Sequence, residues 1–344
     1  MKKLLSVILA TILLLGTVVL TGCNPFELVP TKYDNADKYT AGNTEFEGKV
    51  DNFTVWWIDG SVTVKTHKEN TVKIEETANK EIDDSFRLHW RYHYVEGYGN
   101  VLYVRYSASG NFDFGDLKKD ITIYLPENDG MDLTVNTKYA AVDLDTGGFE
   151  NELAELHILT EFGKVSAKID SADEVRISGQ NDDSVPEANR AITLQASGMI
   201  DDLGISSSYA KLDVSVKKLR YADVATVFND IVFTADEVFS LELSNNDGTT
   251  YATVLDFEQM DFETLFAPCE LTLSPDASFT MTMRDKSRHN HTLAPKNVSV
   301  EFEGTVQEGM KYTVGSGEKT IGVATDSDFR VIPLVTKDDS PAEE

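Results

Sequence analysis

The sequence predicts an all-β protein built from a repeated strand–corner–strand unit, a β-solenoid similar to a right-handed β-helix. Apolar or small residues recur at offsets 0, 2, 4 and 6 and then at 9 and 11, and the residue at offset 7 is small in four copies. Alternate side chains of a strand face one side, so offsets 0 to 6 describe one core-facing strand. The odd step then marks a tight corner with little room for a side chain. An antiparallel β-sandwich is the alternative, because short strands at regular spacing suit it nearly as well.

The first 22 residues have the pattern of a lipoprotein signal peptide. Lys2 and Lys3 precede an uncharged apolar run over residues 4–20, which stops at Gly22-Cys23. A transmembrane helix needs about 20 apolar residues, so the shorter signal sequence is favoured. The segment Leu20-Thr21-Gly22-Cys23 resembles the bacterial lipobox, which implies that Cys23 carries lipid and becomes the first residue of the mature chain. Acyl chains would hold that chain on the membrane without spanning it.

Polar segments are expected at both ends of the mature chain. Residues 23–47 contain two prolines and little apolar periodicity, which predicts a lipidated tether. Residues 337–344 predict a disordered acidic tail.

The repeat is clearest in the middle of the chain. Its copies begin at Phe53, Leu133, Leu156 and Leu203, and their corner residues are Gly60, Ala140, Gly163 and Ala210. The last three starts lie 23 and 47 residues apart, which indicates a period near 23. Aligned copies would stack Thr137, Thr160 and Ser207, and likewise Tyr139, Phe162 and Tyr209, into interior or corner ladders.

Partial copies extend the pattern. Val175 and Ile177 would begin a further turn, completed by Ile192 and Leu194 after an outward loop over residues 180–190. The fragment Tyr-Ala-x-Val returns at Tyr221 and at Tyr251 and carries the pattern further. These features predict a β-strand-repeat domain over residues 48–257 and a β-rich continuation or cap over 258–336.

A hairpin is expected over residues 85–108, with its turn at residues 96–100. Phe86, Leu88, Trp90, Tyr92 and Tyr94 would share one face, and Arg87, His89, Arg91 and His93 the other. The aromatic row either covers the core or stacks on sugar rings, and the cationic row could meet an anionic partner. The candidate ligand surface is therefore Trp90, Tyr92, Tyr94, Arg87 and Arg91.

At the repeat residues the chain resembles a bacterial envelope family of β-strand-repeat proteins named "putative adhesin", a domain of unknown function, here in lipoprotein form. The resemblance covers residues 50–256 and rests on x-Tyr-Ala/Gly-x-Val-x-Leu corners, with Asp59-Gly60-Ser61-Val62 near the start. It implies a repetitive cell-surface β-structure and transfers no catalytic residue. The hairpin at 86–106 and the stretch after 257 depart from the pattern.

No metal or cofactor is predicted. His89 and His93 are about 13 Å apart on a strand and cannot share one ion. His289 and His291 lack a third ligand apart from Asp285. The acidic loops 143–148 and 245–248 could bind calcium weakly, but Asp, Asn and Gly are also ordinary turn residues. Cys269 lies in an apolar context and is expected to be a buried, inert thiol.

Composition narrows the function. The chain has 344 residues with 31 Lys plus Arg against 58 Asp plus Glu, a net charge of −27, and 41% apolar residues. Without Lys2 and Lys3 the net charge is −29, which argues against nucleic-acid binding. No catalytic motif is found among the common hydrolase, nucleotide and zinc fingerprints.

We therefore expect a lipid-anchored, extracytoplasmic, non-enzymatic adhesion or structural module whose partner is an envelope protein or polysaccharide. A glycan- or peptide-binding lipoprotein, an envelope-stress sensor domain and a glycoside-active solenoid are the alternatives.

Overall fold

The structure is a computed structural model that describes residues 36–108, 115–127, 130–147, 153–284, 286–288, 291–293, 297–307 and 311–335. The predicted signal peptide, the predicted lipidation site Cys23 and the predicted tail at 337–344 lie outside these residues. Within them the chain is all-β, with two short 3-10 segments and 24 strands joined in one sheet. Among the described residues no helix has the length and apolar character needed to cross a bilayer.

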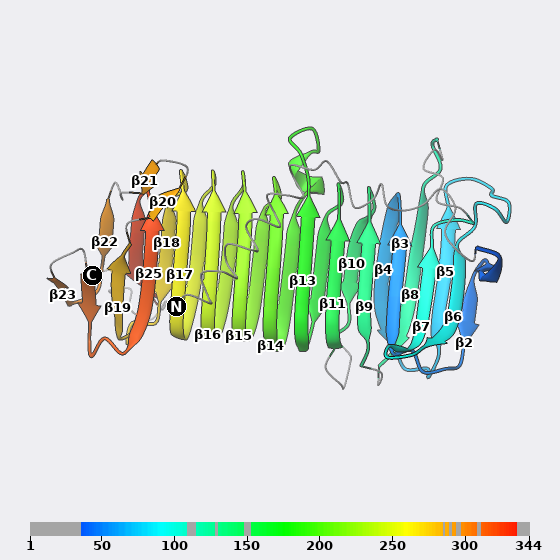
Figure 1. The fold of residues 1–344 in the computed structure, drawn as a ribbon, viewed down its shortest axis with the longest axis horizontal. Helices are drawn as coiled ribbons and strands as arrows, with labels where there is room; N and C mark the ends of the chain where they lie inside the picture. The colour runs from blue at the N-terminus through cyan, green and yellow to red at the C-terminus, as the bar shows by residue number, and fades with distance from the viewer. Residues whose placement is uncertain are drawn as a thin grey trace, which may run out of the picture.

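The strands of the middle of the chain lie side by side along the long axis of the molecule (Figure 1). They are β9 (Asp132–Thr137), β10 (Ala141–Asp145), β11 (Leu153–Thr160), β12 (Val165–Ile169), β13 (Ala172–Gln180), β14 (Ile192–Ser208), β15 (Leu212–Val227), β16 (Ile231–Asn246), β17 (Thr250–Leu265) and β18 (Cys269–Leu273).

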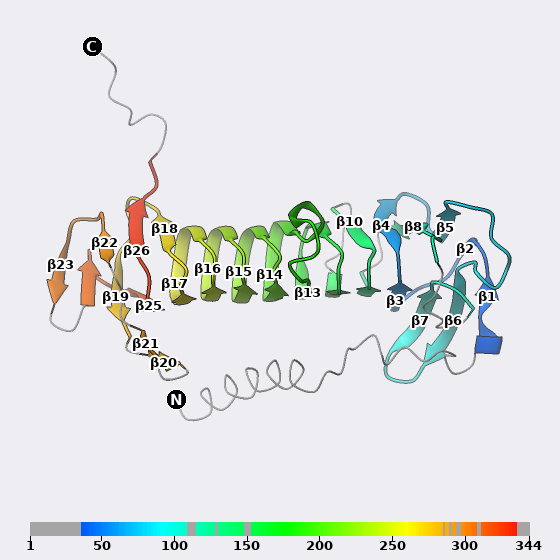
Figure 2. The same ribbon diagram turned by 90° about the horizontal axis from the view of Figure 1, so that it is seen from above.

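Two parallel rows run through this region. One row joins β9, β11 and β13, and the other joins β10 and β12. The first half of β14 continues the second row, and its second half continues the first row. Each of β14 to β17 therefore spans both rows in one bent strand, as the view from above shows (Figure 2).

The N-terminal part covers one end of these rows. Its elements are η1 (Ala36–Lys38), β1 (Thr40–Ala41), β2 (Thr44–Phe46), β3 (Asn52–Trp57), β4 (Gly60–His67), β5 (Val72–Ala78), β6 (His89–Val95), β7 (Gly99–Arg105) and β8 (Lys119–Pro126). Strand β3 lies between β7 and β9, and β4 lies between β8 and β10. After the first repeat unit, β3–β4, the chain thus forms β5 to β8 on the side of this unit that faces the N-terminal end of the rows. It then continues at β9 on the opposite side of the same unit.

The C-terminal part repeats this arrangement at the other end. Its strands are β19 (Phe279–Met283), β20 (Lys286–Arg288), β21 (His291–Leu293), β22 (Val298–Val300), β23 (Gly304–Gln307), β24 (Lys311–Val314), β25 (Lys319–Thr325) and β26 (Phe329–Pro333). Strand β25 lies between β17 and β19, and β26 lies between β18 and β22.

The core consists of columns of apolar side chains at matching positions of neighbouring strands. One column contains Val55, Val135, Ile158, Ile177, Ile205, Val224, Leu243, Phe262 and Val323, all at most 2% exposed. Burying each such side chain contributes roughly 1.5–3 kcal/mol, so the columns supply most of the stability.

The predicted alignment of the repeat is confirmed by the pairing. Leu133 is opposite both Phe53 and Leu156, and Val175 lies between Leu156 and Leu203 in register. Ile192 is opposite Val165, as expected for a unit interrupted by the loop at 180–190. The hairpin is also confirmed, since β6 and β7 pair antiparallel.

The predicted period is wrong for most of the body. Leu203, Ala222, Leu241 and Met260 are successive register partners and lie 19 residues apart. The longer spacings that suggested 23 come from loops outside the strands. Ala222 and Ala252 occupy core positions within β15 and β17, so Tyr221-Ala222 and Tyr251-Ala252 are not corners.

Two expected boundaries also fall differently in the structure. The last part of the predicted tether pairs with the body, because β1 is hydrogen-bonded to β6 and β2 to β5. The expected division at residue 257/258 falls inside β17, a strand that continues to Leu265.

The expected stack of rings lies at a corner, and it is split. Tyr139 and Phe162 are stacked at 5.4 Å between ring centroids, whereas Tyr209 stacks on Phe228 at 4.8 Å. The unit that contains Gly179 lies between Thr160 and Ser207 in the register, so Tyr209 is two units from Phe162.

Candidate functional site

The aromatic row of the hairpin packs partly against the start of the described chain. Phe46 stacks on Trp90 at 6.1 Å and contacts Tyr92 at 5.3 Å between ring centroids. The Tyr92 hydroxyl donates a hydrogen bond to the carbonyl of Lys49 at 2.9 Å. Tyr94, at 70% exposure, projects furthest into solvent. Of the predicted aromatic surface, Tyr94 is thus the ring most available to a partner.

The cationic residues of the hairpin lie in different environments. Arg87 forms an exposed ion pair with Asp84 at 3.5 Å, whereas His89 is buried at 9% exposure. His93 packs on Tyr103 at 5.6 Å, and burial, followed by the charge of Arg91, lowers the pKa of His93. Arg91 and Arg87 keep their predicted role as candidates, but His89 cannot contribute to an exposed row.

The described residues contain no group of three His, Cys, Asp or Glu side chains able to hold a metal ion. His289 and Asp285 lie outside the described residues, as does the side chain of His291. In the loop at 245–248, Asn245 is buried and donates a hydrogen bond to Thr250 at 3.1 Å, so it serves the corner. Cys269 is a buried free thiol, as expected, and burial raises its pKa.

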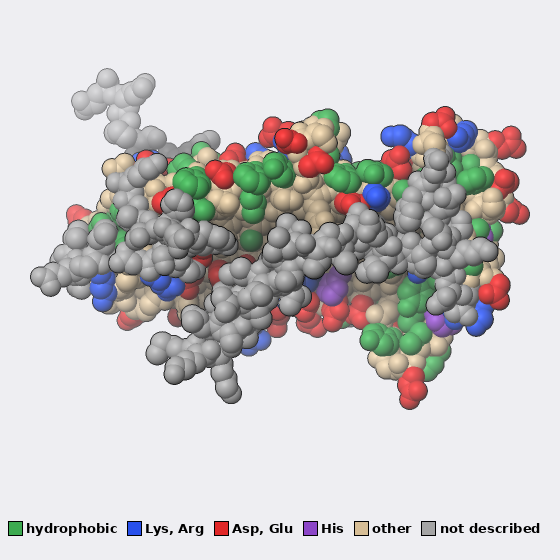
Figure 3. Space-filling model, turned by 45° about the horizontal axis from the view of Figure 1, so that its top comes forward, with side chains coloured by type: hydrophobic (Ala, Val, Ile, Leu, Met, Phe, Trp, Pro, Cys, Tyr) green, Lys and Arg blue, Asp and Glu red, His purple; other side chains and the backbone are tan. Residues whose placement is uncertain are grey.

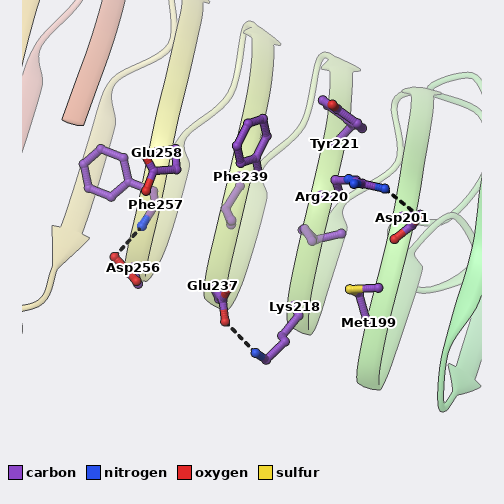
Figure 4. Close-up of a pocket in the computed structure, with 12 residues that line it drawn as sticks. Met199, Asp201, Lys218, Arg220, Tyr221, Glu237, Phe239, Asp256, Phe257 and Glu258 are labelled. Carbon is purple, nitrogen blue, oxygen red and sulfur yellow. Dashed lines mark hydrogen bonds and ion pairs between the residues drawn. The ribbon is translucent and has the colours of Figure 1, made fainter. Parts of the chain in front are cut away.

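A groove of about 560 Å³ lies where β14 to β17 bend from one row to the other (Figure 4). The bend arises because the strict alternation of buried and exposed residues fails twice in each strand. In β15, Lys217-Lys218 and Arg220-Tyr221 are both exposed pairs, separated by the buried Leu219. In β14 the same region carries an extra residue, and the register shifts between Ala196 and Met199.

The floor of the groove is apolar and its walls carry aromatic rings. Leu219, Val238 and Phe257 are buried beneath it. Tyr221 and Phe239, at 49% and 53% exposure, meet edge to face at 5.8 Å. Met199, at 44% exposure, lies further along the groove on β14, opposite Lys218, with Arg220 and Asp201 between it and the rings (Figure 4).

Most charged side chains along the groove form ion pairs. Lys218 donates a hydrogen bond to the Glu237 carboxylate at 2.7 Å, and this bond raises the pKa of Lys218. Arg220 pairs with Asp201 at 3.3 Å, and Lys319 pairs with Asp256 at the far end. Glu258 also lines the groove, and the exposed rings of Tyr221 and Phe239 are its main apolar contact groups.

The groove residues were missed by the sequence interpretation, which treated Tyr221 as part of a corner. The signal was present as two consecutive exposed polar or aromatic residues on each side of a single apolar residue. That pattern breaks the period of two and marks a bent strand with an outward-facing ridge.

No protein-family model matches the chain, and no curated protein does. Solved structures with some likeness include a "putative cell adhesion protein" from Clostridium sporogenes, at 8% identity over 86% of this chain and 100% of that one, with a TM-score of 0.19. Two more are named "putative adhesin". The Parabacteroides merdae protein is 10% identical over 84% of this chain and 96% of its own, with a TM-score of 0.41. The Bacteroides fragilis protein is 10% identical over 86% and 97%, with a TM-score of 0.29. At these scores and identities, the three structures support no conclusion about the fold or the function of this chain.

Proposed function

We propose that this chain is a lipid-anchored, extracytoplasmic interaction module, with a β-solenoid body and no enzymatic activity. The anchor is Cys23, on the strength of the Leu20-Thr21-Gly22-Cys23 sequence. The parallel pairing of successive two-row units favours the solenoid over the antiparallel sandwich. An adhesive or structural role on the envelope surface follows from such an anchor and an elongated, repetitive body.

The observation that carries the proposed role is the groove. Soluble proteins seldom expose neighbouring large apolar side chains without a partner, and exposed apolar groups rimmed by polar residues mark interaction sites. Tyr221 and Phe239 form such a group, and the ion pairs Lys218–Glu237 and Arg220–Asp201 lie beside it. The expected partner is a protein or polysaccharide of the envelope.

The groove is tested by binding of the purified mature chain to intact cells and isolated envelopes of the source bacterium. We expect Tyr221→Ser combined with Phe239→Ser to weaken binding about tenfold or more. Tyr98→Ser, which removes a 66% exposed ring from the hairpin, is the matched control and should bind normally. Equal binding by the groove variant and the control would exclude the groove as the contact surface.

The anchor is tested separately. We expect wild-type protein to fractionate with membranes and to incorporate labelled palmitate, and Cys23→Ala to do neither. A Cys23→Ala protein that still carries label would contradict lipidation at this residue.

A further inference from the structure

The exposed ring of Phe239 lies beside a carboxylate in the groove. The register of β16 and β17 places Phe239 next to Glu258, and the close-up shows the two side chains as neighbours (Figure 4). Glu258 is exposed, and within the part of the chain that the structure describes it forms no ion pair. On the other side of the ring, Arg220 turns towards Asp201 and pairs with it at 3.3 Å. The Phe239 ring therefore adjoins a carboxylate that has no cation of its own.

More carboxylates lie on the same face, just beyond the rings. Asp223, Glu242 and Asp261 are successive register partners in β15, β16 and β17, and we call them the carboxylate ladder. Asp223 is two residues from Tyr221, and Asp261 pairs with Arg284 at the far end, at 2.6 Å. Acidic side chains are also the more common charged type in the middle of the space-filling view (Figure 3). The groove is thus bordered by negative charge along its length.

The basic residue that approaches the carboxylate ladder from β13 is held by another carboxylate. Arg176 lies two strands from Asp223, with Gly204 between them in the register. Its guanidinium donates two hydrogen bonds to Asp202, at 3.0 and 2.7 Å. Like charges on adjacent strands destabilise a sheet, so a cation bound at Asp223 would stabilise the folded protein.

One end of the groove shows how the protein itself holds a cation against a ring and a carboxylate. Lys319 of β25 lies over the Phe257 ring at 5.5 Å and pairs with Asp256. In the adjacent unit Phe239 and Glu258 offer the same two kinds of group, but there the ring is 53% exposed. In the described residues no basic side chain lies over the Phe239 ring. Because a cation is attracted both by a ring face and by a carboxylate, this comparison favours a basic side chain of a partner as the occupant.

The spacing of the groups fits a polypeptide. Tyr221 and Asp223 are residues i and i+2 of one strand, and side chains in such positions point to one face about 7 Å apart. An extended peptide presents its own alternate side chains at the same spacing, so an apolar and a basic residue of one segment can meet both. The groove, at about 560 Å³, has room for side chains of this size. An amino polysaccharide supplies cations but carries no large apolar side chain to pack on Tyr221 and Phe239.

We propose that the groove binds an extended, basic segment of a partner protein in which apolar and basic side chains alternate. One basic side chain lies on the Phe239 ring and pairs with Glu258. An apolar side chain packs on Tyr221, and a second basic side chain pairs with Asp223 of the carboxylate ladder. This inference rests on the proposed function, in which the groove is the contact surface, and adds the chemistry of the partner.

The test uses the full mature chain and three blocked peptides as probes, of alternating Arg and Leu, of alternating Arg and Ser, and of alternating Glu and Leu. Calorimetry at low salt measures their dissociation constants. We expect the Arg–Leu peptide to bind, and added salt to weaken its binding. The Arg–Ser peptide lacks the apolar side chains and should bind at least about fivefold more weakly, and the Glu–Leu peptide should not bind. Equal binding of the Arg–Leu and Arg–Ser peptides would mean attraction to net charge alone and would overturn the proposal.

Variants that neutralise charge locate the binding site. We expect Asp223→Asn combined with Glu258→Gln to bind the Arg–Leu peptide about fivefold more weakly or worse. The Tm should stay the same or rise, because repulsion within the carboxylate ladder falls. Asp143→Asn combined with Asp213→Asn removes the same charge from exposed positions of the other row and should bind as the wild type does. Equal affinity of these two double variants for the peptide would contradict the assignment.

Two comparisons separate this inference from the proposed function on which it rests. Suppose that Tyr221→Ser/Phe239→Ser loses binding to envelopes but the wild type binds no Arg–Leu peptide. The groove would then remain the contact surface, and the basic partner would be wrong. Full envelope binding by that variant, with no peptide binding by the wild type, would remove both. Chitosan, a cationic polysaccharide, is the last probe. If it bound more tightly than the Arg–Leu peptide and lost affinity in Asp223→Asn/Glu258→Gln, the partner would be a polysaccharide and the proposal of a polypeptide would fall.

Discussion

Lys119 is a fully buried cation in the part of the protein that covers the N-terminal end of the rows. Its ammonium group pairs with Glu76 at 2.5 Å and donates hydrogen bonds to the carbonyls of Phe86 and Tyr106. It also lies 4.9 and 4.1 Å from the ring centroids of Trp57 and Tyr106. The Trp57 indole donates back to the Lys119 carbonyl at 2.8 Å. This cluster ties together β3, β5 and β8, and nothing in the sequence around Lys118-Lys119 distinguishes it from an exposed lysine pair.

Burial lowers the pKa of Lys119 from 10.5 to about 8, against the opposing effect of Glu76. Between those two pH values the unfolded state binds more protons than the folded state, so the stability rises with pH. We expect the free energy of unfolding of the wild type to gain about 2 kcal/mol between pH 7.5 and 10, relative to Lys119→Met/Glu76→Gln. Urea unfolding at the two pH values measures this. The double variant is the reference because removing one partner alone would leave a buried charge unpaired. Parallel pH profiles of the two proteins would contradict the prediction.

At the scale of the elements, the corner was the most predictable part of the fold. The predicted corner residues Ala140 and Ala210 are both 0% exposed, and Gly60 and Gly163 hold the same place in their units, whereas the unit that starts at Ala222 has Asn229 there. At Gly163 the reason for a small residue is close packing, since a Cβ there would lie 2.1 Å from the carbonyl oxygen of Ala140 in the adjacent unit. The bend within β14 to β17 was not predicted. A strand is recognised in the sequence by alternating apolar and polar residues, and one buried residue between two exposed pairs breaks this alternation in the way that a loop does.

The close approach of Gly163 to the adjacent unit predicts that a larger side chain at this position destabilises the protein. We expect Gly163→Ala to destabilise the protein by about 1–3 kcal/mol, because backbone atoms of two units must separate to admit the methyl group. Gly147→Ala is the control, since its nearest contacts are side-chain atoms of Asp145 and Lys168 at 3.3 Å or more. Chemical denaturation measures both. A cost below about 0.5 kcal/mol for Gly163→Ala would mean that the units are not held at this spacing.

Along the length of the protein, contacts between consecutive units were predictable from the sequence, whereas contacts between units that are not consecutive in the chain were not. Leu133, Leu156 and Val175 follow one another in both sequence and space. The chain order is broken at both ends. Strands β3 and β4 pair with β7 and β8, and β25 lies between β17 and β19, so these units contact partners that are far away in the chain. An apolar period cannot reveal such an order, because every unit offers the same kind of face to either neighbour. The groove was missed for a related reason. Its lining residues come from β14, β15, β16 and β17, so it cannot be predicted without the register of these strands.

Stability should therefore vary along the long axis. In repetitive proteins each unit is held mainly by its two neighbours, and the interior units are the most protected. Strands β15 and β16 pair over nearly their whole lengths with parallel strands on both sides. The hairpin β6–β7 is bounded by the two-residue β1 on one side and ends in a turn where Tyr98 is 66% exposed. Hydrogen exchange followed by mass spectrometry should show the slowest amides in β14 to β17 and much faster exchange in β6 and the tip of β7.

Strands β3 and β4 serve as the internal comparison, because they lie in the same N-terminal part but have parallel partners on both sides. They should exchange at rates close to those of the middle of the chain. If β6 exchanged as slowly as β15, the N-terminal part would unfold together with the body, and the description of stability as a sum over neighbouring units would not apply to this protein.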